Sequence, residues 1–346
     1  MNCSSRSGTL PLEDQGLLRI RPAVQTLAEA LSSYMSQIEV LEDHTLQLGY
    51  SGREDVLEIL KLLVAASTDV LGGVLVQLSG LEDMEMDDSW IPPHILKSRI
   101  EHSDMVHLMM QRCFTSYMQP IVDLDTKVIG YEFLLRPLSG VRVFQPFQLF
   151  EVARKTGLLS FLDNEARISA IEASARWLPN GIKRFINFLP SSINDPQYCL
   201  DLTFEAIDRL SLNPQDFVFE VVETEQIDDM RAIQQIFEQY RSRGMSVALD
   251  DLGAGYSTLE VMNRLQPDYV KIDRGIIDGC HQDADKQRQI SQIVESARRF
   301  AGRVLAEGIE QREDFEFCRE AGVSLAQGYL FGKPDERPVC WHRALR

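Results

Sequence analysis

Seven apolar runs of this chain contain, or end on, a polar side chain that can bind a cation or move a proton. These side chains are Glu132, Asn187, Glu220, Asp250 with Asp251, Lys271, Glu307 and Gln327. Carboxylate and amide oxygens are the ligands that hard cations such as Mg²⁺ and Mn²⁺ prefer. Two adjacent aspartates can bridge or flank two ions, and a two-ion site suits the hydrolysis of phosphate esters. A lysine in that setting would orient the attacking water or meet developing negative charge.

Each of these groups has a simpler explanation when it is taken alone. A single acid after a strand commonly caps a helix or lies in a solvated loop, and Lys271 by itself could be a surface residue. Unpaired acids beside apolar strands are costly, however, so their repetition over successive runs indicates a shared site. The six histidines lie outside these runs, which argues against a zinc site with histidine ligands.

Short apolar runs alternate with longer amphipathic segments from about Ser103 onward. The runs are Tyr117–Leu124, Val128–Leu135, Phe185–Phe188, Phe217–Val222, Ser246–Leu249, Tyr269–Ile272, Val304–Ala306 and Val323–Ala326. This alternation is typical of an α/β fold with a mostly parallel sheet. Eight runs favour a closed (β/α)8 barrel of the TIM type, which typically takes about 250 residues, over the alternative of an open doubly wound sheet. In such a barrel the carboxyl ends of the strands share one face, which would bring the polar side chains together.

The chain before this region predicts three further segments. Residues 1–20 are polar and predict a flexible tail. Residues 21–80 predict a small all-α domain, because apolar residues from Val24 to Leu41 recur at helical spacing and a second helix should start near Arg53. Residues 81–100 are acidic, contain Pro92 and Pro93, and predict a linker to the barrel domain at 101–346. We expect the two helices to form a hairpin that packs on a second copy in a dimer or on the barrel domain; our hypothesis is that it packs in a homodimer and regulates the barrel.

The composition excludes several classes of protein. The formal net charge of −17 argues against binding a nucleic-acid polymer, because such binding depends on lysine and arginine. The six cysteines are scattered, without metal-finger spacing, and the N-terminus lacks a secretion signal, so we expect a cytoplasmic protein with reduced thiols. The most apolar stretch, from Ile59 to Leu78, is interrupted by polar residues and predicts a buried helix rather than a membrane span.

Ordered motifs make the segment from about Ser103 to Pro334 resemble the EAL-domain cyclic di-GMP phosphodiesterases. The matching stretches are Gln119-Pro-Ile-Val-Asp-Leu, Tyr131-Glu-Phe-Leu-Leu-Arg136, Ile186-Asn-Phe, Phe219-Glu-Val-Val-Glu223, Ala248-Leu-Asp-Asp-Leu-Gly-Ala-Gly-Tyr-Ser257, Val270-Lys-Ile-Asp-Arg274, Ala306-Glu-Gly-Ile-Glu310 and Gln327-Gly-Tyr-Leu-Phe-Gly332. They occur in the family's order and cover about two-thirds of the chain, a combination that is far more specific than any single motif.

The resemblance implies a TIM-type barrel with an atypical first strand, and hydrolysis of cyclic di-GMP to linear pGpG through a water activated by two Mg²⁺ or Mn²⁺ ions. The metal ligands it implies are Glu132, Asn187, Glu220, Asp250 and Asp251. Lys271 and Glu307 would position or activate the water, and Glu223 would brace the glycine loop that follows Asp251. The substrate contacts it implies are Gln119, Arg136 and Gln327.

This chain departs from the family pattern at a few positions. The signature Glu-Ala-Leu reads Glu132-Phe133-Leu134, and Val222 replaces a threonine hydroxyl before Glu223. Leu252 and Leu189 also differ from the usual residues, but none of these changes removes an expected ligand. Activity is therefore favoured over the alternative of a catalytically silent EAL domain that acts as a cyclic di-GMP receptor or a protein-interaction switch. An unrelated metal-dependent TIM-barrel hydrolase fits the ordered motifs poorly.

Overall fold

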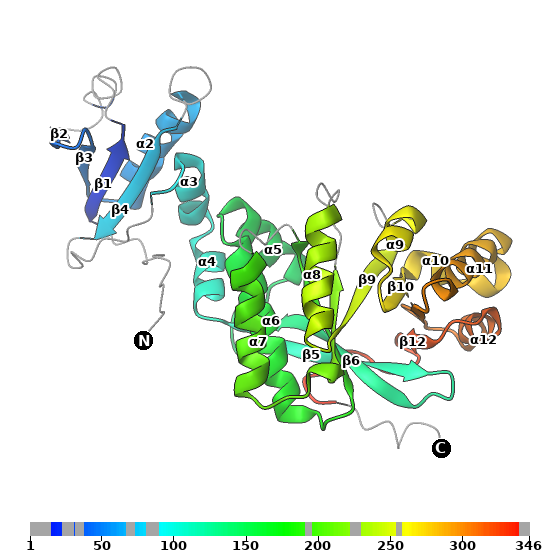
Figure 1. Cartoon of the computed structure of the whole chain (residues 1–346). Coiled ribbons are helices and arrows are strands. Elements are labelled where there is room, and N and C mark those ends of the chain that lie inside the picture. Colours follow the sequence, from blue (N-terminus) through cyan, green and yellow to red (C-terminus); the bar gives the residue numbers. More distant parts are fainter. Residues whose placement is uncertain are drawn as a thin grey trace. The chain divides into compact units, whose positions relative to one another are not determined.

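The computed structural model describes residues 15–22, 31, 38–66, 73–80, 90–190, 196–221, 230–253 and 258–338 (Figure 1). The chain divides into two compact units. The first comprises residues 1–113 and 144–159, and the second comprises residues 114–143 and 160–346.

The first unit contains a four-stranded sheet and several helices. Its elements are β1 (Gly16–Arg21), β2 (Ile38–Val40), β3 (Leu46–Tyr50), α2 (Arg53–Ala66), β4 (Leu75–Gly80), α3 (Pro93–Glu101), α4 (Ser103–Met110) and α5 (Pro146–Lys155). The strand order is β2-β3-β1-β4, and every neighbouring pair is antiparallel. Alternate residues of β1, such as Leu18 and Ile20, are fully buried in one apolar cluster with Leu60 and Leu63 of α2. Helix α2 therefore supplies part of the core that stabilises this sheet.

The predicted all-α character of residues 21–80 is wrong, because four strands lie between residues 16 and 80. Gly16–Arg21, assigned mostly to the flexible tail, pairs with both β3 and β4. Ile38–Val40 fell at helical spacing but pairs with β3, so pairing between strands overrode the local pattern. Leu41, the last residue of the predicted stripe, is not helical, and Leu31 is helical and buried; residues 23–30 and 32–37 lie outside the described part of the chain. The start of the second helix near Arg53 is confirmed as α2, with Glu54 and Asp55 in its first turn, but α2 ends at Ala66 and Val74, expected in the same helix, is not helical.

The predicted linker at 81–100 is contradicted from residue 93 onward, where α3 begins. Pro93 occupies the first turn of this helix, a position that tolerates proline because its missing N–H would have no partner there. The two prolines therefore mark the start of a helix, which α4 follows before the barrel strands begin. Residues 81–89 lie outside the described part of the chain.

The second unit is a closed eight-stranded barrel with helices on its outside. Its strands are β5 (Phe114–Asp123), β6 (Val128–Pro137), β7 (Lys183–Phe188), β8 (Phe217–Val221), β9 (Ser246–Leu252), β10 (Tyr269–Ile272), β11 (Arg303–Ala306) and β12 (Leu325–Gln327). They close in the order β10-β11-β12-β5-β6-β7-β8-β9. Strand β5 runs antiparallel to both neighbours, β12 and β6, whereas the other pairs are parallel. The prediction of a TIM-type barrel with an atypical first strand is confirmed.

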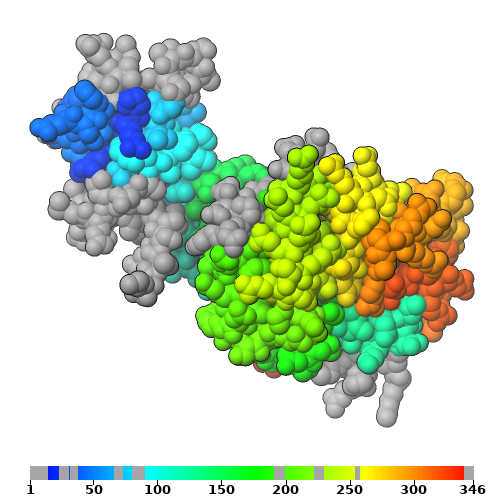
Figure 2. Space-filling model, in the orientation of Figure 1, coloured from blue at the N-terminus to red at the C-terminus, as the bar shows by residue number. Residues whose placement is uncertain are grey.

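Helices connect the strands and cover the outside of the barrel. They are α6 (Leu159–Trp177), α7 (Pro196–Arg209), α8 (Met230–Ser242), α9 (Leu259–Leu265), α10 (Arg274–Ile277), α11 (Ala284–Arg298) and α12 (Arg312–Ala321), with short 3-10 turns at Pro214–Asp216 and Cys280–Gln282. In Figure 2 the green, yellow and orange helices form most of the visible surface of this unit, while the teal hairpin of β5 and β6 also reaches the surface. No helix in the described ranges is long and apolar enough to span a membrane.

The barrel interior contains one layer of apolar side chains, with one residue from every strand except β6. Its members are Ile121, Phe185, Val218, Ala248, Tyr269, Leu305 and Leu325, all buried in one cluster. Gly130 of β6 faces this layer, since a Cβ atom there would lie 3.2 Å from the ring of Phe185. Successive side chains of a strand point to opposite faces, so the residues two positions further along also point into the barrel. This layer is the floor on which the polar side chains lie.

We predict that Leu305→Ala destabilises the barrel by about 2–5 kcal/mol, because it leaves a cavity in this closely packed layer. Chemical denaturation followed by circular dichroism measures the effect. Leu259→Ala is the matched control, because Leu259 is 37% exposed and the same change there should alter the free energy of unfolding by less than about 0.5 kcal/mol. Equal losses in the two variants would contradict the assignment of Leu305 to the interior.

Candidate metal centre

The polar residues predicted from the sequence form a second layer directly above the apolar one. Each lies two positions after an inner residue of the parallel strands, as Asn187 follows Phe185 and Glu220 follows Val218. The same spacing holds for Glu132, Asp250, Lys271, Glu307 and Gln327. In the antiparallel strand β5 the order reverses, so Gln119 precedes Ile121 and lies opposite Glu132. The alternation of strand side chains therefore brings eight residues into one layer, seven from strands and Glu307 from the position directly after β11.

Asp251 is an exception to this alternation, because adjacent strand residues normally face opposite sides. The register between β9 and β10 shifts after Val270, so β9 contains one more residue than its partner over this stretch. Asp251 has a φ of 52°, in the left-handed region that aspartate and asparagine tolerate better than most residues. Such a bulge can re-aim a side chain beside an active site. Here it allows two consecutive aspartates to approach the same centre.

The ammonium group of Lys271 lies among four carboxylates. Its Nζ atom is 2.8 Å from Glu307 Oε1, 2.9 Å from Asp250 Oδ1, 3.1 Å from Glu220 Oε1 and 3.4 Å from Glu132 Oε1. Lys271 and Glu220 are completely buried. One positive charge therefore faces four acids in an environment where charge is weakly screened.

This imbalance perturbs the protonation of every member. Burial alone would lower the pKa of Lys271, but the surrounding carboxylates raise it well above its usual value. Burial raises the pKa of Glu220 and of Glu307 well above the ordinary range, despite the opposing effect of Lys271. Burial would also raise the pKa of Glu132, yet Lys271 and hydrogen bonds from amides lower it. The site is therefore short of positive charge.

The acids form two overlapping groups that could each hold a cation. Ligand oxygens of Glu132, Glu220 and Asp250 lie within 4.8 Å of one another, and so do those of Asp250, Asp251 and Glu307. Asp250 belongs to both groups, as expected for a carboxylate that bridges two ions. Within the described part of the chain, the Oε2 atom of Glu220 and the Oδ1 atom of Asn187 accept no hydrogen bond, whereas Oε1 of Glu220 faces Lys271. Buried oxygens in this state fit divalent cations, which prefer oxygen ligands.

Amide side chains orient the carboxylate of Glu132 from both sides. Asn187 Nδ2 donates to Glu132 Oε1 at 3.3 Å, and Gln327 Nε2 donates to Oε2 at 2.6 Å. Gln327 also donates to Gln119 Oε1 at 3.2 Å, while Gln119 Nε2 donates to the carbonyl of Gly332 at 3.3 Å. The predicted substrate contacts Gln119 and Gln327 thus hold a predicted metal ligand in place.

One predicted site residue, Arg136, lies apart from this layer, and another, Glu223, lies outside the described residues. Arg136 is four positions beyond Glu132 on β6, on the same face of the strand but nearer the rim, and its Nη1 donates to the carbonyl of Leu135. Glu223 and most of the glycine loop, residues 254–257, lie outside the described residues, so the bracing role of Glu223 stays a prediction.

Sequence analysis missed one buried pair behind the layer, formed by Asp163 and Arg167 on α6. Their side chains are 3.0 Å apart, and Asp163 also accepts a hydrogen bond from the backbone N–H of Leu189, beyond the end of β7. The available signal was an acid and a base four positions apart within a predicted helix, a spacing that usually marks an exposed pair.

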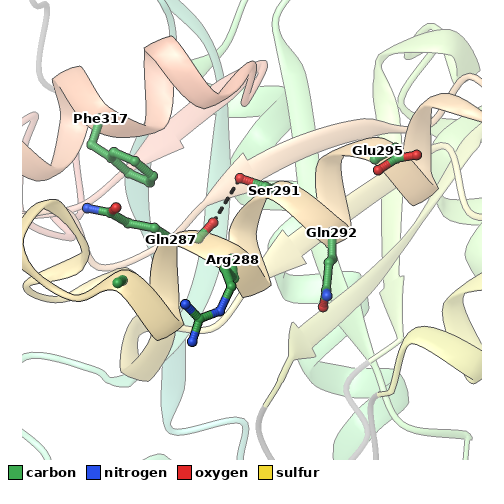
Figure 3. Close-up of a pocket in the computed structure, with 7 residues that line it drawn as sticks. Gln287, Arg288, Ser291, Gln292, Glu295 and Phe317 are labelled. Atoms are coloured by element: carbon green, nitrogen blue, oxygen red, sulfur yellow. Dashed lines mark hydrogen bonds between the residues drawn. The ribbon is translucent and has the colours of Figure 1, made fainter.

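A hollow of about 490 Å³ lies elsewhere on the barrel unit, between α11 and α12 (Figure 3). It is lined by Ala284, Gln287, Arg288, Ser291, Gln292, Glu295 and Phe317. None of the predicted site residues lines it, and it contains one basic and one acidic side chain. The buried layer around Lys271 is therefore the stronger candidate for chemistry.

The sequence model of the EAL domain family matches residues 104–334. The bifunctional diguanylate cyclase/cyclic di-GMP phosphodiesterase MucR of Pseudomonas aeruginosa is 30% identical over 239 residues, which cover 67% of this chain and 34% of MucR. The probable cyclic di-GMP phosphodiesterase PdeG of Escherichia coli K12 is 29% identical over 266 residues, or 73% of this chain and 49% of PdeG. This chain thus spans about a third to a half of the length of these relatives.

Solved structures share the fold. A standalone EAL protein of Vibrio cholerae O395, in its c-di-GMP bound form, is 34% identical with a TM-score of 0.59 and covers 65% of this chain and 93% of its own. BlrP1 of Klebsiella pneumoniae, in a calcium and cyclic di-GMP complex, is 23% identical with a TM-score of 0.57 and covers 93% of this chain and 96% of its own. The second likeness is one of fold alone, and its coverage reaches beyond the EAL segment into the first unit.

We predict that Mg²⁺ or Mn²⁺ raises the unfolding temperature of chelator-treated protein, and raises it more at about pH 8 than at about pH 5. Burial and the neighbouring carboxylate of Asp250 raise the pKa of Asp251 to about 6. Below that pH a proton occupies the group and competes with the cation; above it the carboxylate is free to bind. Thermal unfolding at both pH values, with and without the ion, measures the difference.

The matched controls for this measurement are two aspartate-to-asparagine variants. Asp251→Asn removes one titrating group and should reduce the pH dependence, whereas Asp208→Asn, at an exposed position on α7, should leave it unchanged. An ion-induced shift in the wild type that is equal at both pH values contradicts the assignment.

Proposed function

We propose, from the premise that this chain belongs to the EAL domain family, that it hydrolyses cyclic di-GMP to linear pGpG. The observation that carries the proposal is the pair of overlapping acidic groups that share Asp250 around Lys271. A site of this kind suits an anionic phosphodiester only when cations compensate its acids, which is the condition for two-ion hydrolysis. The curated relatives MucR and PdeG, named as phosphodiesterases of this nucleotide, support the choice of substrate.

The residues that fit two Mg²⁺ or Mn²⁺ ions are Glu132, Asn187, Glu220, Asp250 and Asp251. The oxygens of the acids converge, and Glu220 Oε2 and Asn187 Oδ1 are buried without a hydrogen-bonding partner among the described residues. When bound, the ions would polarise the phosphate and lower the pKa of the attacking water.

The remaining polar residues of the layer divide into proton-transfer and positioning roles. Glu307 is the proposed base, because burial raises its pKa toward the range in which a carboxylate accepts a proton efficiently. Lys271, held as a cation by its acidic neighbours, would hydrogen-bond the attacking water and stabilise negative charge on the phosphate. Gln327 keeps Glu132 oriented, and Arg136 at the rim of β6 would meet a substrate phosphate.

We also propose that the first unit regulates the barrel and that the protein acts as a homodimer in the cytoplasm. The first unit has an apolar core of its own, which supports a separate regulatory role. The free thiols of Cys113, Cys199, Cys280 and Cys318 fit a reducing compartment such as the cytoplasm. Light scattering on the full chain should give twice the 39.3 kDa mass of one chain. A monomer at working concentrations with full activity would reject the dimer.

The direct test is incubation of purified full-length protein with cyclic di-GMP and either ion, followed by chromatography of the nucleotides. We expect pGpG to accumulate in proportion to enzyme and to be absent when a chelator is added. Tight binding of cyclic di-GMP without turnover under both ions would instead identify a silent receptor.

Glu132→Ala should lower the rate of pGpG formation by about 100-fold or more. The change removes a proposed metal ligand, whose carboxylate also contacts Lys271, Asn187 and Gln327. Glu205→Ala is the matched control, since Glu205 is exposed on α7 and should keep the wild-type rate. Circular dichroism establishes that both variants fold. An unaffected rate in Glu132→Ala would refute the metal assignment.

A further inference from the structure

Asp163 and Arg167 form an ion pair that is almost completely buried. Asp163 is 3% and Arg167 is 2% exposed, and Arg167 Nη1 lies 3.0 Å from Asp163 Oδ2. The two residues are one turn apart on α6, and Arg167 also donates to the side chain of Asn164. Removing two charges from water commonly costs as much free energy as their attraction returns, so such a pair is weak support for stability alone. A contribution to stability alone therefore does not explain why this pair is buried.

The second oxygen of Asp163 reaches the end of a barrel strand. Oδ1 accepts a hydrogen bond from the backbone N–H of Leu189 at 3.1 Å. Leu189 follows Phe188, the last residue of β7, and lies two residues after Asn187. A carboxylate held by an arginine on one oxygen is a fixed acceptor for the amide on the other. Helix α6 thus determines the path of the chain as it leaves β7.

The position of Asn187 depends on this path. Its Nδ2 atom donates to Glu132 Oε1 at 3.3 Å, while its Oδ1 atom is buried and accepts no hydrogen bond from the described residues. The terminal torsion of an asparagine amide is soft, so the direction of the oxygen follows the backbone that supports it. A displacement of about 1 Å can cost a site much of its activity.

We infer that Asp163, fixed by Arg167, is a positioning residue that holds the end of β7 so that the oxygen of Asn187 faces the cation group of Glu132, Glu220 and Asp250. The inference rests on the proposed function for the identity of that group, but it concerns a helix residue outside the layer. An acid with a purely structural role would affect only the stability of the fold, whereas Asp163 in this role also controls the affinity of the site for the cation.

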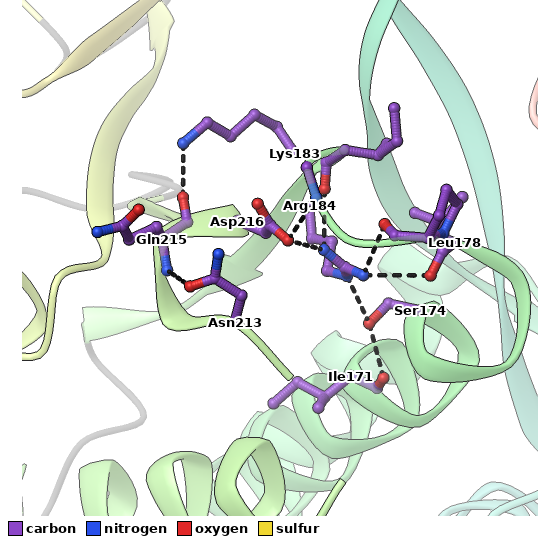
Figure 4. Close-up of polar contacts among 11 residues, drawn as sticks. Ile171, Ser174, Leu178, Lys183, Arg184, Asn213, Gln215 and Asp216 are labelled. Atoms are coloured by element: carbon purple, nitrogen blue, oxygen red, sulfur yellow. Dashed lines mark hydrogen bonds and ion pairs between the residues drawn. The ribbon is translucent and has the colours of Figure 1, made fainter. Parts of the chain in front are cut away.

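The opposite end of the same strand provides a matched control. Arg184, the second residue of β7, lies 3.0 Å from Asp216 Oδ2, and these residues are 0% and 4% exposed. Arg184 also donates to Ser174 and to the carbonyls of Ile182, Leu178 and Pro179, and Asp216 accepts from the backbone N–H of Gly181 (Figure 4). This pair resembles the other in length and burial, but it lies at the amino end of the strand.

The experiment compares Asp163→Ala with Asp216→Ala in the full chain. Binding of Mn²⁺ is measured by electron paramagnetic resonance, folding by thermal unfolding, and turnover by kcat and KM for cyclic di-GMP. We expect both variants to unfold at lower temperature. Only Asp163→Ala should weaken Mn²⁺ binding, by about 10-fold or more, and lower kcat with little change in KM.

Wild-type Mn²⁺ affinity in Asp163→Ala, or an equal loss of affinity in both variants, would overturn the inference. Should Asp163→Ala fail to fold, Asp163→Asn replaces it, because asparagine keeps an oxygen for the amide of Leu189 but loses the charge that holds Arg167. Several-fold weaker binding of Mn²⁺ is then expected relative to Asp216→Asn, and wild-type affinity would overturn the inference.

The wild-type chain separates this inference from the proposed function. A wild type that binds Mn²⁺ but forms no pGpG refutes the proposed hydrolysis, and the affinity comparison still decides the role of Asp163. A wild type that binds no Mn²⁺ refutes the cation group and the positioning role with it.

Discussion

The ammonium of Lys271, buried among the carboxylates of Glu132, Glu220, Asp250 and Glu307, is the interaction on which the barrel face depends. Charges removed from water are tolerated only when they are paired and hydrogen-bonded. One lysine cannot neutralise four acids, and the raised pKa values of Glu220 and Glu307 reflect that deficit. Lys271 therefore neutralises only part of the negative charge of the layer, and bound cations would neutralise the rest. The electrostatic strain of the layer is the property that suits it to bind ions.

The barrel tolerates this layer because everything next to it is rigid and apolar. Directly beneath it, residues such as Phe185 and Leu305 fill the interior. Outside the strands, Phe188, Phe219 and Tyr240 pack together, with ring centroids 4.2 Å apart for Phe219 and Tyr240 and 5.7 Å apart for Phe188 and Tyr240. Strands fixed from both sides hold their inward side chains at defined separations. The antiparallel β5 completes the closure and adds Gln119, which reaches Glu132 through Gln327.

The first unit is organised around a sheet, whereas its sequence indicated a pair of helices. Its apolar residues satisfy helical spacing in places, yet the strands between residues 16 and 80 are selected by pairing across a sheet. A three-residue strand such as Ile38–Val40 has no signal of its own and exists because β3 lies beside it. The likeness of fold to BlrP1 covers 93% of this chain, so it includes residues of the first unit as well as the barrel.

The sequence by itself determined the barrel and seven members of the polar layer, because each lies within or just after an apolar run and the carboxyl ends of parallel strands share one face. Gln119 was indicated only by the family resemblance. Strand β10, at Tyr269–Ile272, was predicted residue for residue. Only the tertiary structure decided how the layer works. The extra residue in β9 that brings Asp251 beside Asp250, the four acids around Lys271, and the contact of Asp163 with Leu189 all join segments that are distant in sequence or depart from regular geometry. Local patterns record which face a side chain takes, whereas the pairing of buried charges depends on distances that exist only once the barrel has closed.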